Sequence, residues 1–230
     1  MVDVRANYRM IVDRIGDAAT KVGRKPEEIK ILAAGKSQSV EFIRTAITAG
    51  VRMIGENYVQ EAEVKRQAVS ESVEWHMIGH LQRNKAKAAV KIFDLIQSLD
   101  SVALALELNN EGKKQEKRIR TLIEVNLGGE ATKSGIAEDR IKELFRVVGD
   151  LTYLGVEGLM TVPPFKENPE EQRPYFSSLR ELQMELRSLK IPNVNLKELS
   201  MGMTHDYPVA VEEGATIVRI GTALFGPRQT

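Results

Sequence analysis

Strand-like and helix-like segments alternate along the whole chain, and this alternation limits the possible folds more than any other feature. Short apolar runs are separated by segments whose apolar residues recur at helical spacing. The eight strand-like segments lie at 29–34, 51–54, 73–78, 93–97, 120–125, 154–159, 197–199 and 216–219. The helix-like segments lie at 40–49, 58–69, 84–90, 102–117, 140–150, 170–189 and 207–213, and another helical pattern at 8–15 precedes the first strand.

An order of strand, helix and strand predicts parallel strands that are joined by right-handed crossovers. The chain length of 230 residues is close to the roughly 250 residues of a typical closed barrel of this kind. We therefore predict an α/β fold, a single-domain (β/α)8 TIM barrel over residues 1–230 with an extra N-terminal helix.

Composition excludes several classes of function. Lys and Arg number 33 against 32 Asp and Glu, so the net charge of +1 gives no reason to expect nucleic acid or a membrane as a partner. The absence of Cys excludes disulfides, thiolate nucleophiles and sulfur-ligated metals. No apolar run resembles a signal peptide or reaches membrane-spanning length, so we expect a cytoplasmic protein.

Lys36 is the first candidate for chemistry, because functional groups of parallel barrels lie just beyond the carboxyl ends of the strands. It follows the first predicted strand, behind Gly35. A partly desolvated lysine loses its proton more readily, and its free amine can attack an aldehyde. A solvated lysine at a strand end is the simpler interpretation of this segment taken alone.

Hydroxyls and glycines follow the seventh and eighth predicted strands, in the segments Ser200-Met201-Gly202-Met203-Thr204 and Ile220-Gly221-Thr222. Phosphate groups recurrently bind these two loops in barrels of this fold, through backbone N–H groups. Tight turns and helix caps would use the same residue types. The spacing therefore favours a phosphate site without excluding a purely structural role.

Arg219 ends the last predicted strand and should point into or over the barrel mouth. An unpaired guanidinium would be costly there, so it needs an acceptor. A ring nitrogen of a ligand could be that acceptor, and so could a carboxylate in a structural ion pair.

Taken together, the motifs of this chain resemble those of the pyridoxal phosphate homeostasis protein family. The motifs are Gly35-Lys36, Gly55-Glu56-Asn57-Tyr58, Ile78-Gly79-His80-Leu81-Gln82-Arg83-Asn84-Lys85, Leu159-Met160-Thr161-Val162-Pro163-Pro164, Ser200-Met201-Gly202-Met203 and Val218-Arg219-Ile220-Gly221-Thr222. The family is similar to the barrel domain of alanine racemase, of the fold type III pyridoxal 5′-phosphate (PLP) proteins, without the second domain. The chain departs from it in having Gly35 and Thr204 where members usually or often have Ser.

The resemblance implies a role for each motif. Lys36 would hold PLP as a Schiff base, and Arg219 would face the pyridine nitrogen. The remaining residues that it implies for the cofactor site are Ser200, Gly221 and Thr222 at the phosphate, Met201 and Gly202 beside Ser200, and Asn57 and His80 along the pocket.

Two further features of the sequence are a pair of histidines and a loop-like segment. His76 and His80 are four residues apart, but a strand at 73–78 would not place them on one helical face, so we expect no metal site. The segment from Asn126 to Gly135, with Glu130 and Lys133, resembles a loop of the family. It is either a solvated loop or a mobile cover over the cofactor.

The resemblance implies a vitamin B6 carrier or regulator and not an efficient enzyme, with PLP-dependent apoenzymes as recipients. Racemisation needs acid or base groups on both faces of the substrate carbon, and Lys36 could serve only one. Alanine racemase takes the opposing group from its partner subunit, and we find no segment for the dimerising second domain, so we expect a monomer. A weak PLP-dependent amino-acid racemase and a barrel aldolase that uses Lys36 on a sugar phosphate are the alternatives.

Overall fold

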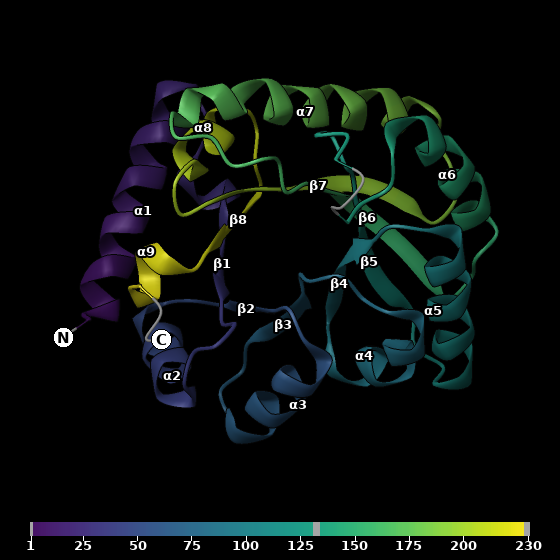
Figure 1. The fold of residues 1–230 in the computed structure, drawn as a ribbon, viewed down its shortest axis with the longest axis horizontal. Coiled ribbons are helices and arrows are strands. Elements are labelled where there is room, and N and C mark those ends of the chain that lie inside the picture. Colours follow the sequence, from purple (N-terminus) through teal and green to yellow (C-terminus); the bar gives the residue numbers. More distant parts are fainter. Residues whose placement is uncertain (1, 131–133, 228–230) are drawn as a thin grey trace.

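Eight parallel strands close into a barrel in the computed structural model, which describes residues 2–130 and 134–227 (Figure 1). Each strand pairs in parallel with the next along the chain, and β1 pairs with β8 to complete the circle. The strands are β1 (Lys30–Ala34), β2 (Met53–Glu56), β3 (Glu74–Met77), β4 (Leu95–Leu99), β5 (Ile119–Glu124), β6 (Leu154–Met160), β7 (Val194–Met203) and β8 (Ile217–Ile220). The predicted (β/α)8 TIM barrel is confirmed.

Helices surround the barrel. They are α1 (Val4–Lys21), α2 (Val40–Ala49), α3 (Val59–Ala68), α4 (Ala86–Ile92), α5 (Val102–Lys114), α6 (Ile141–Gly149), α7 (Arg173–Ser188), α8 (Tyr207–Glu212) and the short α9 (Thr222–Phe225). Single 3-10 turns are η1 (Pro26–Glu28), η2 (Arg83–Lys85), η3 (Glu138–Arg140) and η4 (Pro169–Gln172). None of the helices in the described ranges has the length and apolarity that crossing a bilayer needs.

The extra N-terminal helix α1 completes the outer ring. Within the described residues the helix that follows β8 is α9, a single turn, and α1 packs against α2, α8 and α9 at that place (Figure 1). The side chain of Asp3 caps α1 by accepting from the backbone N–H groups of Arg5 and Ala6, both at 3.0 Å. The predicted N-terminal helix is confirmed, and it covers strands that would otherwise be open to solvent.

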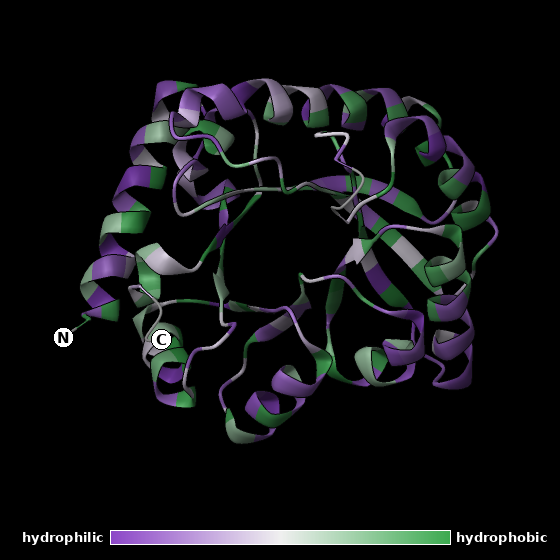
Figure 2. Ribbon diagram, in the orientation of Figure 1, coloured by the Kyte–Doolittle hydropathy of each residue, from purple (hydrophilic) through white to green (hydrophobic). Residues whose placement is uncertain are grey.

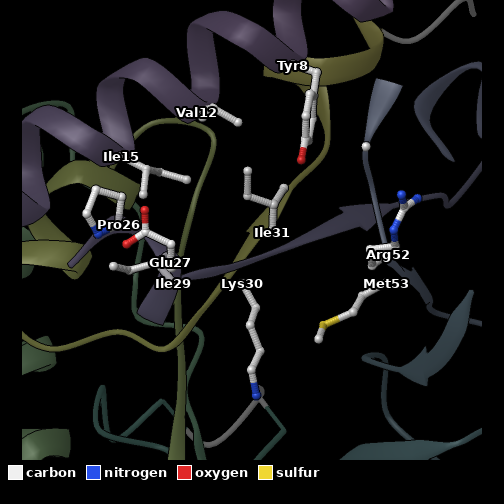
Figure 3. Close-up of a pocket in the computed structure, with 11 residues that line it drawn as sticks. Tyr8, Val12, Ile15, Pro26, Glu27, Ile29, Lys30, Ile31, Arg52 and Met53 are labelled. Carbon is white, nitrogen blue, oxygen red and sulfur yellow. The ribbon is translucent and has the colours of Figure 1, made fainter. Parts of the chain in front are cut away.

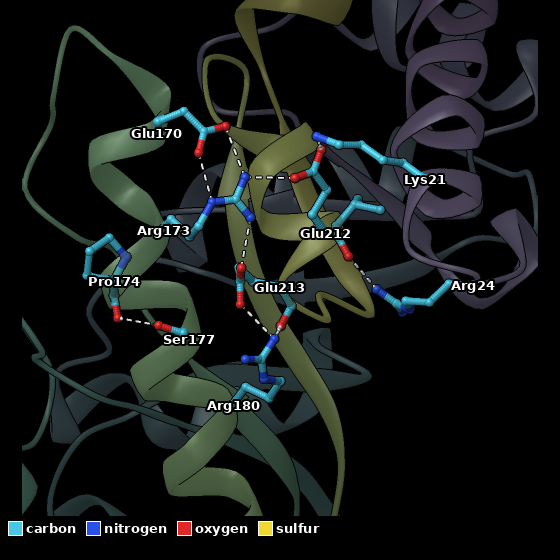
Figure 4. Close-up of polar contacts among 10 residues, drawn as sticks. Lys21, Arg24, Glu170, Arg173, Pro174, Ser177, Arg180, Glu212 and Glu213 are labelled. Carbon is cyan, nitrogen blue, oxygen red and sulfur yellow. Dashed lines mark hydrogen bonds and ion pairs between the residues drawn. The ribbon is translucent and has the colours of Figure 1, made fainter.

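Charged side chains join α1, α7 and α8 on one side of the molecule (Figure 4). Arg173 contacts Glu170, Glu212 and Glu213, with nitrogen to oxygen distances between 2.7 and 2.9 Å. Lys21 of α1 binds the same Glu212 at 2.7 Å. This cluster fixes the helices that stand behind the seventh and eighth loops of the barrel.

The apolar core has two layers. The larger layer fills the space between the strands and the helices, and Figure 2 shows the matching division of the helices into hydrophobic and hydrophilic faces. A smaller layer inside the barrel consists of Leu32, Leu95, Leu122, Met160 and Ile217. Several strands also contain buried polar residues, among them His76 of β3, Gln97 of β4, Ser200 of β7 and Arg219 of β8.

The predicted boundaries of the seventh strand are wrong. We expected a strand over 197–199 with a loop from Ser200 onward, whereas β7 extends from Val194 to Met203. Glu198 in the middle of this strand accepts from Lys30 at 2.6 Å and from the Thr216 hydroxyl at 2.6 Å. Ser200, Met201 and Gly202 therefore lie within the strand.

Candidate functional site

A cavity of about 440 Å³ opens at the carboxyl ends of the strands. Five of the residues predicted for the site line it, namely Lys36, Asn57, Arg219, Gly221 and Thr222. They come from the ends of β1, β2 and β8, which are neighbours in the barrel. Strand-end position indicated Lys36, Arg219, Gly221 and Thr222, whereas Asn57 was predicted from the family resemblance.

The backbone on both sides of Lys36 is held by one buried ion cluster. The Lys65 ammonium of α3 donates to the Gly35 carbonyl at 2.6 Å, and it also binds Glu56 at 2.8 Å and Glu61 at 2.6 Å. Glu61 in turn accepts from the backbone N–H of Ser37 at 2.7 Å. The peptide groups that flank Lys36 are therefore tied to the same three side chains.

The geometry around this cluster explains the glycine before Lys36. A Cβ atom on residue 35 would lie 2.6 Å from Oε1 of Glu56, so a larger side chain would displace that carboxylate. Glu56 is fully buried, and burial raises its pKa to about 7 against the opposing effect of Lys65. The residue following Lys36, Ser37, has a φ of 62°, which fixes a sharp turn away from the strand.

Asn57 is positioned by a close approach of two strand ends. Gly79 follows β3, and a Cβ atom there would lie 2.5 Å from the backbone oxygen of Asn57. Only glycine allows this approach, which brings the backbone of residue 57 against the end of the neighbouring strand.

The loops after β7 and β8 meet at the cavity. The Thr204 hydroxyl accepts from the backbone N–H of Ala223 at 3.1 Å, and Thr204 lines the cavity together with Gly221 and Thr222. The carboxylate of Asp206 fixes the turn by accepting from the backbone N–H of Met203 at 2.6 Å. Our site prediction left out Thr204, although its hydroxyl was noted in the sequence.

Arg219 is a buried cation that lines the cavity, with a side chain held by neutral acceptors. Its two Nη atoms donate to the Ser200 hydroxyl and to the Thr161 carbonyl, each at 2.7 Å. Among residues 2–130 and 134–227, the carboxylates of Glu124 and Asp206 attract its charge, but neither forms a close ion pair with it. Burial lowers its pKa to about 10, and the guanidinium is therefore still charged at neutral pH.

Four predicted site residues do not line the cavity, and three of them lie in β7. Ser200 is fully buried inside the barrel, and its hydroxyl donates to Gln97 Oε1 at 2.6 Å. Met201 packs into the apolar layer beneath the helices. Gly202 has a φ of 87°, and a Cβ there would lie 2.5 Å from Ala210, so backbone packing accounts for this glycine.

His80 also lies outside this cavity. It lines an adjoining pocket of about 360 Å³, which shares Asn57 with the first, and its Nδ1 lies 3.0 Å from Asp100. His76 is buried inside the barrel, where Gln97 and Glu74 contact its two ring nitrogens. No group of three metal-ligating side chains occurs within the described residues.

The loop after β5 is only partly described. Asn126 donates from its side-chain amide to the backbone oxygen of Glu130 at 3.0 Å. Lys133 lies outside the described residues. The loop's role as a cover over the cofactor stays a prediction.

A second groove, of about 330 Å³, lies at the opposite end of the barrel (Figure 3). Tyr8, Val12 and Ile15 of α1 face Ile31 across it, and Lys30 begins the strand that Lys36 follows. The amino-terminal face of such barrels serves stability. We therefore interpret this groove as packing between α1 and the barrel.

Comparison with known proteins agrees with this geometry. The family model for the alanine racemase N-terminal domain matches residues 4–229. A pyridoxal phosphate homeostasis protein of Aquifex aeolicus is 47% identical over 220 residues, which cover 95% of this chain and 96% of that protein. The chain belongs to the pyridoxal phosphate homeostasis protein family. The Escherichia coli K12 protein of the same name is 37% identical over 232 residues, covering 99% of this chain and 98% of its own length.

Solved structures of PipY and of alanine racemases share the fold. PipY of Synechococcus elongatus, in a structure with PLP bound, is 34% identical with a TM-score of 0.82, over 94% of this chain and all (100%) of that one. An alanine racemase of Clostridium difficile is 17% identical with a TM-score of 0.74, over 98% of this chain and 58% of the racemase. The likeness to the racemase, at 17% identity, concerns the fold alone.

Proposed function

We propose that this chain binds PLP in the cavity at the barrel mouth and holds it as a Schiff base on Lys36, as a protein of vitamin B6 homeostasis. The observation that carries the proposal is Arg219, a buried guanidinium on the cavity that Lys36 also lines. Its hydrogen bonds in the described ranges go to neutral acceptors, and the nearby carboxylates of Glu124 and Asp206 form no close ion pair with it. A cation placed in this way calls for an acceptor from a ligand.

The residues around the cavity suit the parts of PLP. Its aldehyde would bond to the Lys36 amine, and its pyridine nitrogen would accept from Arg219. The hydroxyls of Thr204 and Thr222 and the backbone at Gly221 would bind the phosphate. When bound, PLP supplies a reversible carbonyl bond to amines and a ring that can accept electrons.

In this proposal Ser200 supports Arg219 and does not bind phosphate through its hydroxyl. The hydroxyl already accepts from Arg219 and donates to Gln97, and its single proton is thereby used. Met201 and Gly202 would act through the path of the β7 backbone, and His80 and Asn57 would border the entrance.

We further propose that the protein catalyses no efficient reaction. With a pKa of about 10, Arg219 remains a donor at neutral pH, and a donor at the pyridine nitrogen keeps that nitrogen unprotonated. An unprotonated ring accepts electrons poorly, so carbanion chemistry would be slow. Besides Lys36 and Arg219, the titratable group on the described cavity wall is His205, which is exposed and lies 2.7 Å from the Glu167 carbonyl through Nε2.

The test of PLP carriage is the visible spectrum of the protein after incubation with PLP. We expect an absorption band that disappears on borohydride reduction, with the reduced adduct found by mass analysis on Lys36. The Lys36→Ala variant should fold and show no band, while Lys166→Ala, at a lysine beside the cavity residue Phe165, should behave as wild type. A band that survives Lys36→Ala, or an adduct only on another lysine, would refute the assignment. A protein that shows no band but cleaves a sugar phosphate would support the aldolase alternative.

The test of catalysis is hydrogen exchange at the α-carbon of amino acids in deuterated buffer. We expect negligible exchange by the PLP-loaded wild type and faster exchange by Arg219→Glu, in which the ring nitrogen can be protonated. Turnover by the wild type in the ordinary enzyme range of about 1 to 1,000 per second would establish the racemase alternative instead.

Three other expectations stay predictions. The protein should be a monomer, which light scattering after size-exclusion chromatography can check. It should be located in the cytoplasm, and PLP-dependent apoenzymes should be able to take PLP from it. Transfer is measurable as recovery of activity when an apoenzyme is mixed with the loaded protein.

A further inference from the structure

A continuous chain of hydrogen bonds runs from Arg219 through the inside of the barrel to Glu74, and we call it the Arg219–Glu74 chain. Arg219 Nη1 lies 2.7 Å from the Ser200 hydroxyl, which lies 2.6 Å from Gln97 Oε1. Gln97 Nε2 lies 2.9 Å from His76 Nδ1, and His76 Nε2 lies 3.0 Å from Glu74 Oε2. The four residues from Arg219 to His76 are all buried.

The direction of every hydrogen bond in the chain is determined from the Arg219 end. A guanidinium can only donate, so the Ser200 oxygen accepts and its one proton goes to Gln97 Oε1. The Gln97 amide must then present its nitrogen to His76, whose Nδ1 has to accept.

The Glu74 end requires the same arrangement independently. A carboxylate only accepts, so His76 must carry its proton on Nε2, which leaves Nδ1 free as an acceptor. The hydrogen bond from His76 is also the main reason that the pKa of Glu74 is lowered. Because the two ends agree, the chain has one arrangement of its protons when His76 is neutral.

This order matters at Arg219, because within the described residues the hydrogen bonds of its guanidinium go to neutral acceptors, and Glu124 and Asp206 attract its charge without a close ion pair. Only the Ser200 hydroxyl and the Thr161 carbonyl are found to accept from it among the described residues. The Ser200 oxygen accepts from Arg219 through a lone pair, and its bond to Gln97 Oε1 turns the hydroxyl proton away from the guanidinium. His76 fixes which end of the Gln97 amide faces Ser200.

We propose that Gln97 and His76 are positioning residues of the PLP site, which orient the Arg219 guanidinium toward the pyridine nitrogen through the Ser200 hydroxyl. The inference rests on the proposed binding of PLP. It assigns a function to two buried polar side chains that lie beneath the cavity and do not line it. It also gives Ser200 a role that differs from direct phosphate binding.

The test is a double-mutant cycle on the dissociation constant of PLP, measured by equilibrium dialysis with the full-length protein. Gln97→Met removes both hydrogen bonds while keeping much of the side-chain volume, and we expect about a tenfold weaker affinity, the size of one hydrogen bond to a charged group. In an Arg219→Lys background the same substitution should change the affinity less than twofold, because its effect passes through the guanidinium. His76→Phe should follow the same pattern.

Thr121→Val is the matched control. Thr121 is also fully buried in the barrel, and its hydroxyl donates to the Gly155 carbonyl at 3.0 Å, outside the Arg219–Glu74 chain. We expect its affinity for PLP to stay within twofold of the wild type. Equal effects of Gln97→Met in both backgrounds, or no effect in either, would overturn the inference and leave PLP binding intact. A wild type that binds no PLP would instead remove the proposed function.

A second measurement uses the unmodified protein and does not depend on how well a variant folds. Nitrogen-15 NMR of the histidines, with His76 identified by its loss in His76→Phe, reports which ring nitrogen carries the proton. We expect the proton on Nε2 at pH 8, both with and without PLP. A proton on Nδ1 would reverse the chain at Gln97 and overturn the inference.

Discussion

Replacement of Lys65 by Met tests how the segment around Lys36 is held. The Lys65 side chain is 8% exposed, and its ammonium group bridges Glu56, Glu61 and the Gly35 carbonyl. Methionine keeps most of the aliphatic stem, so the variant removes the charge and its hydrogen bonds with little change in packing.

The magnitude follows from the burial of Glu56. Its side chain has no exposed surface, so loss of Lys65 would leave an unpaired buried carboxylate, which costs about 3 to 5 kcal/mol. The protein can reduce this cost by protonating Glu56, whose pKa is already about 7 with Lys65 present and would rise further without it. The loss of stability should therefore be larger at pH 8 than at pH 6.

The assay is urea unfolding followed by circular dichroism at pH 6 and pH 8. Lys65→Met together with Glu56→Gln should be more stable at pH 8 than Lys65→Met alone, because the double variant has no unpaired buried carboxylate at residue 56. Lys21→Met is the control, since Lys21 is 66% exposed in its pair with Glu212 and should contribute less than about 1 kcal/mol. The reduced PLP adduct on Lys36 should also form more slowly in Lys65→Met, because the Gly35 carbonyl loses its donor.

Two results would refute this reasoning. A loss below about 1 kcal/mol at pH 8 would mean that solvent or a rearrangement satisfies Glu56. An equal loss at both pH values would mean that protonation of Glu56 plays no part.

Three further predictions concern the phosphate, the stability of the barrel interior and the helix cluster. Thr204→Val and Thr222→Val should each weaken PLP binding by about 1.5 to 3 kcal/mol without changing affinity for pyridoxal, which lacks the phosphate; equal losses for both ligands in binding titrations would contradict this. Burial raises the pKa of Glu124 to about 7, so the folded state binds its proton more tightly than the unfolded chain. This stabilisation is complete below about pH 4.5 and is lost as the pH rises through 7, by at most about 3 kcal/mol. The free energy of unfolding of Glu124→Gln, measured in urea, should accordingly decrease less between pH 5 and pH 8 than that of the wild type. An equal decrease in both proteins would contradict the assignment. Arg173→Met should lower the free energy of unfolding by only about 1 kcal/mol in low salt, because Glu212 and Glu213 keep Lys21 and Arg180 as partners. The loss should be smaller in 1 M salt, which screens charges, and a loss independent of salt would argue against an electrostatic origin.

The fold was predictable because each strand and helix has a recognisable pattern of apolar residues within its own segment. Apolar runs and helical spacing reflect burial against the neighbouring layer, which every (β/α) unit repeats. The rule that strand ends carry function then located Lys36 and Arg219 without any knowledge of side-chain contacts, and the family resemblance added Asn57. These two regularities depend on position along the chain and not on long-range packing.

The parts that the sequence did not reveal depend on contacts between distant segments. Lys65 and Glu61 are four residues apart on α3 and resemble an ordinary surface pair, and only the fold brings the buried Glu56 beside them. Ser200 likewise was predicted as a loop hydroxyl, because the predicted seventh strand ended at residue 199. Its partners Gln97 and Arg219 are 103 and 19 residues away in the chain.

The two buried networks fix the cofactor site at two separate places, which fits a protein that holds PLP and does not transform it. Lys65 and Glu61 hold the backbone on both sides of Lys36, where the covalent bond would form. The Arg219–Glu74 chain holds the guanidinium that would face the pyridine nitrogen. A ring fixed at its aldehyde and at its nitrogen keeps one orientation, and with Arg219 as a permanent donor it gains little capacity to stabilise a carbanion. Under the proposed function, both networks therefore contribute to retention and orientation of PLP, and its release would depend on breaking the bond to Lys36.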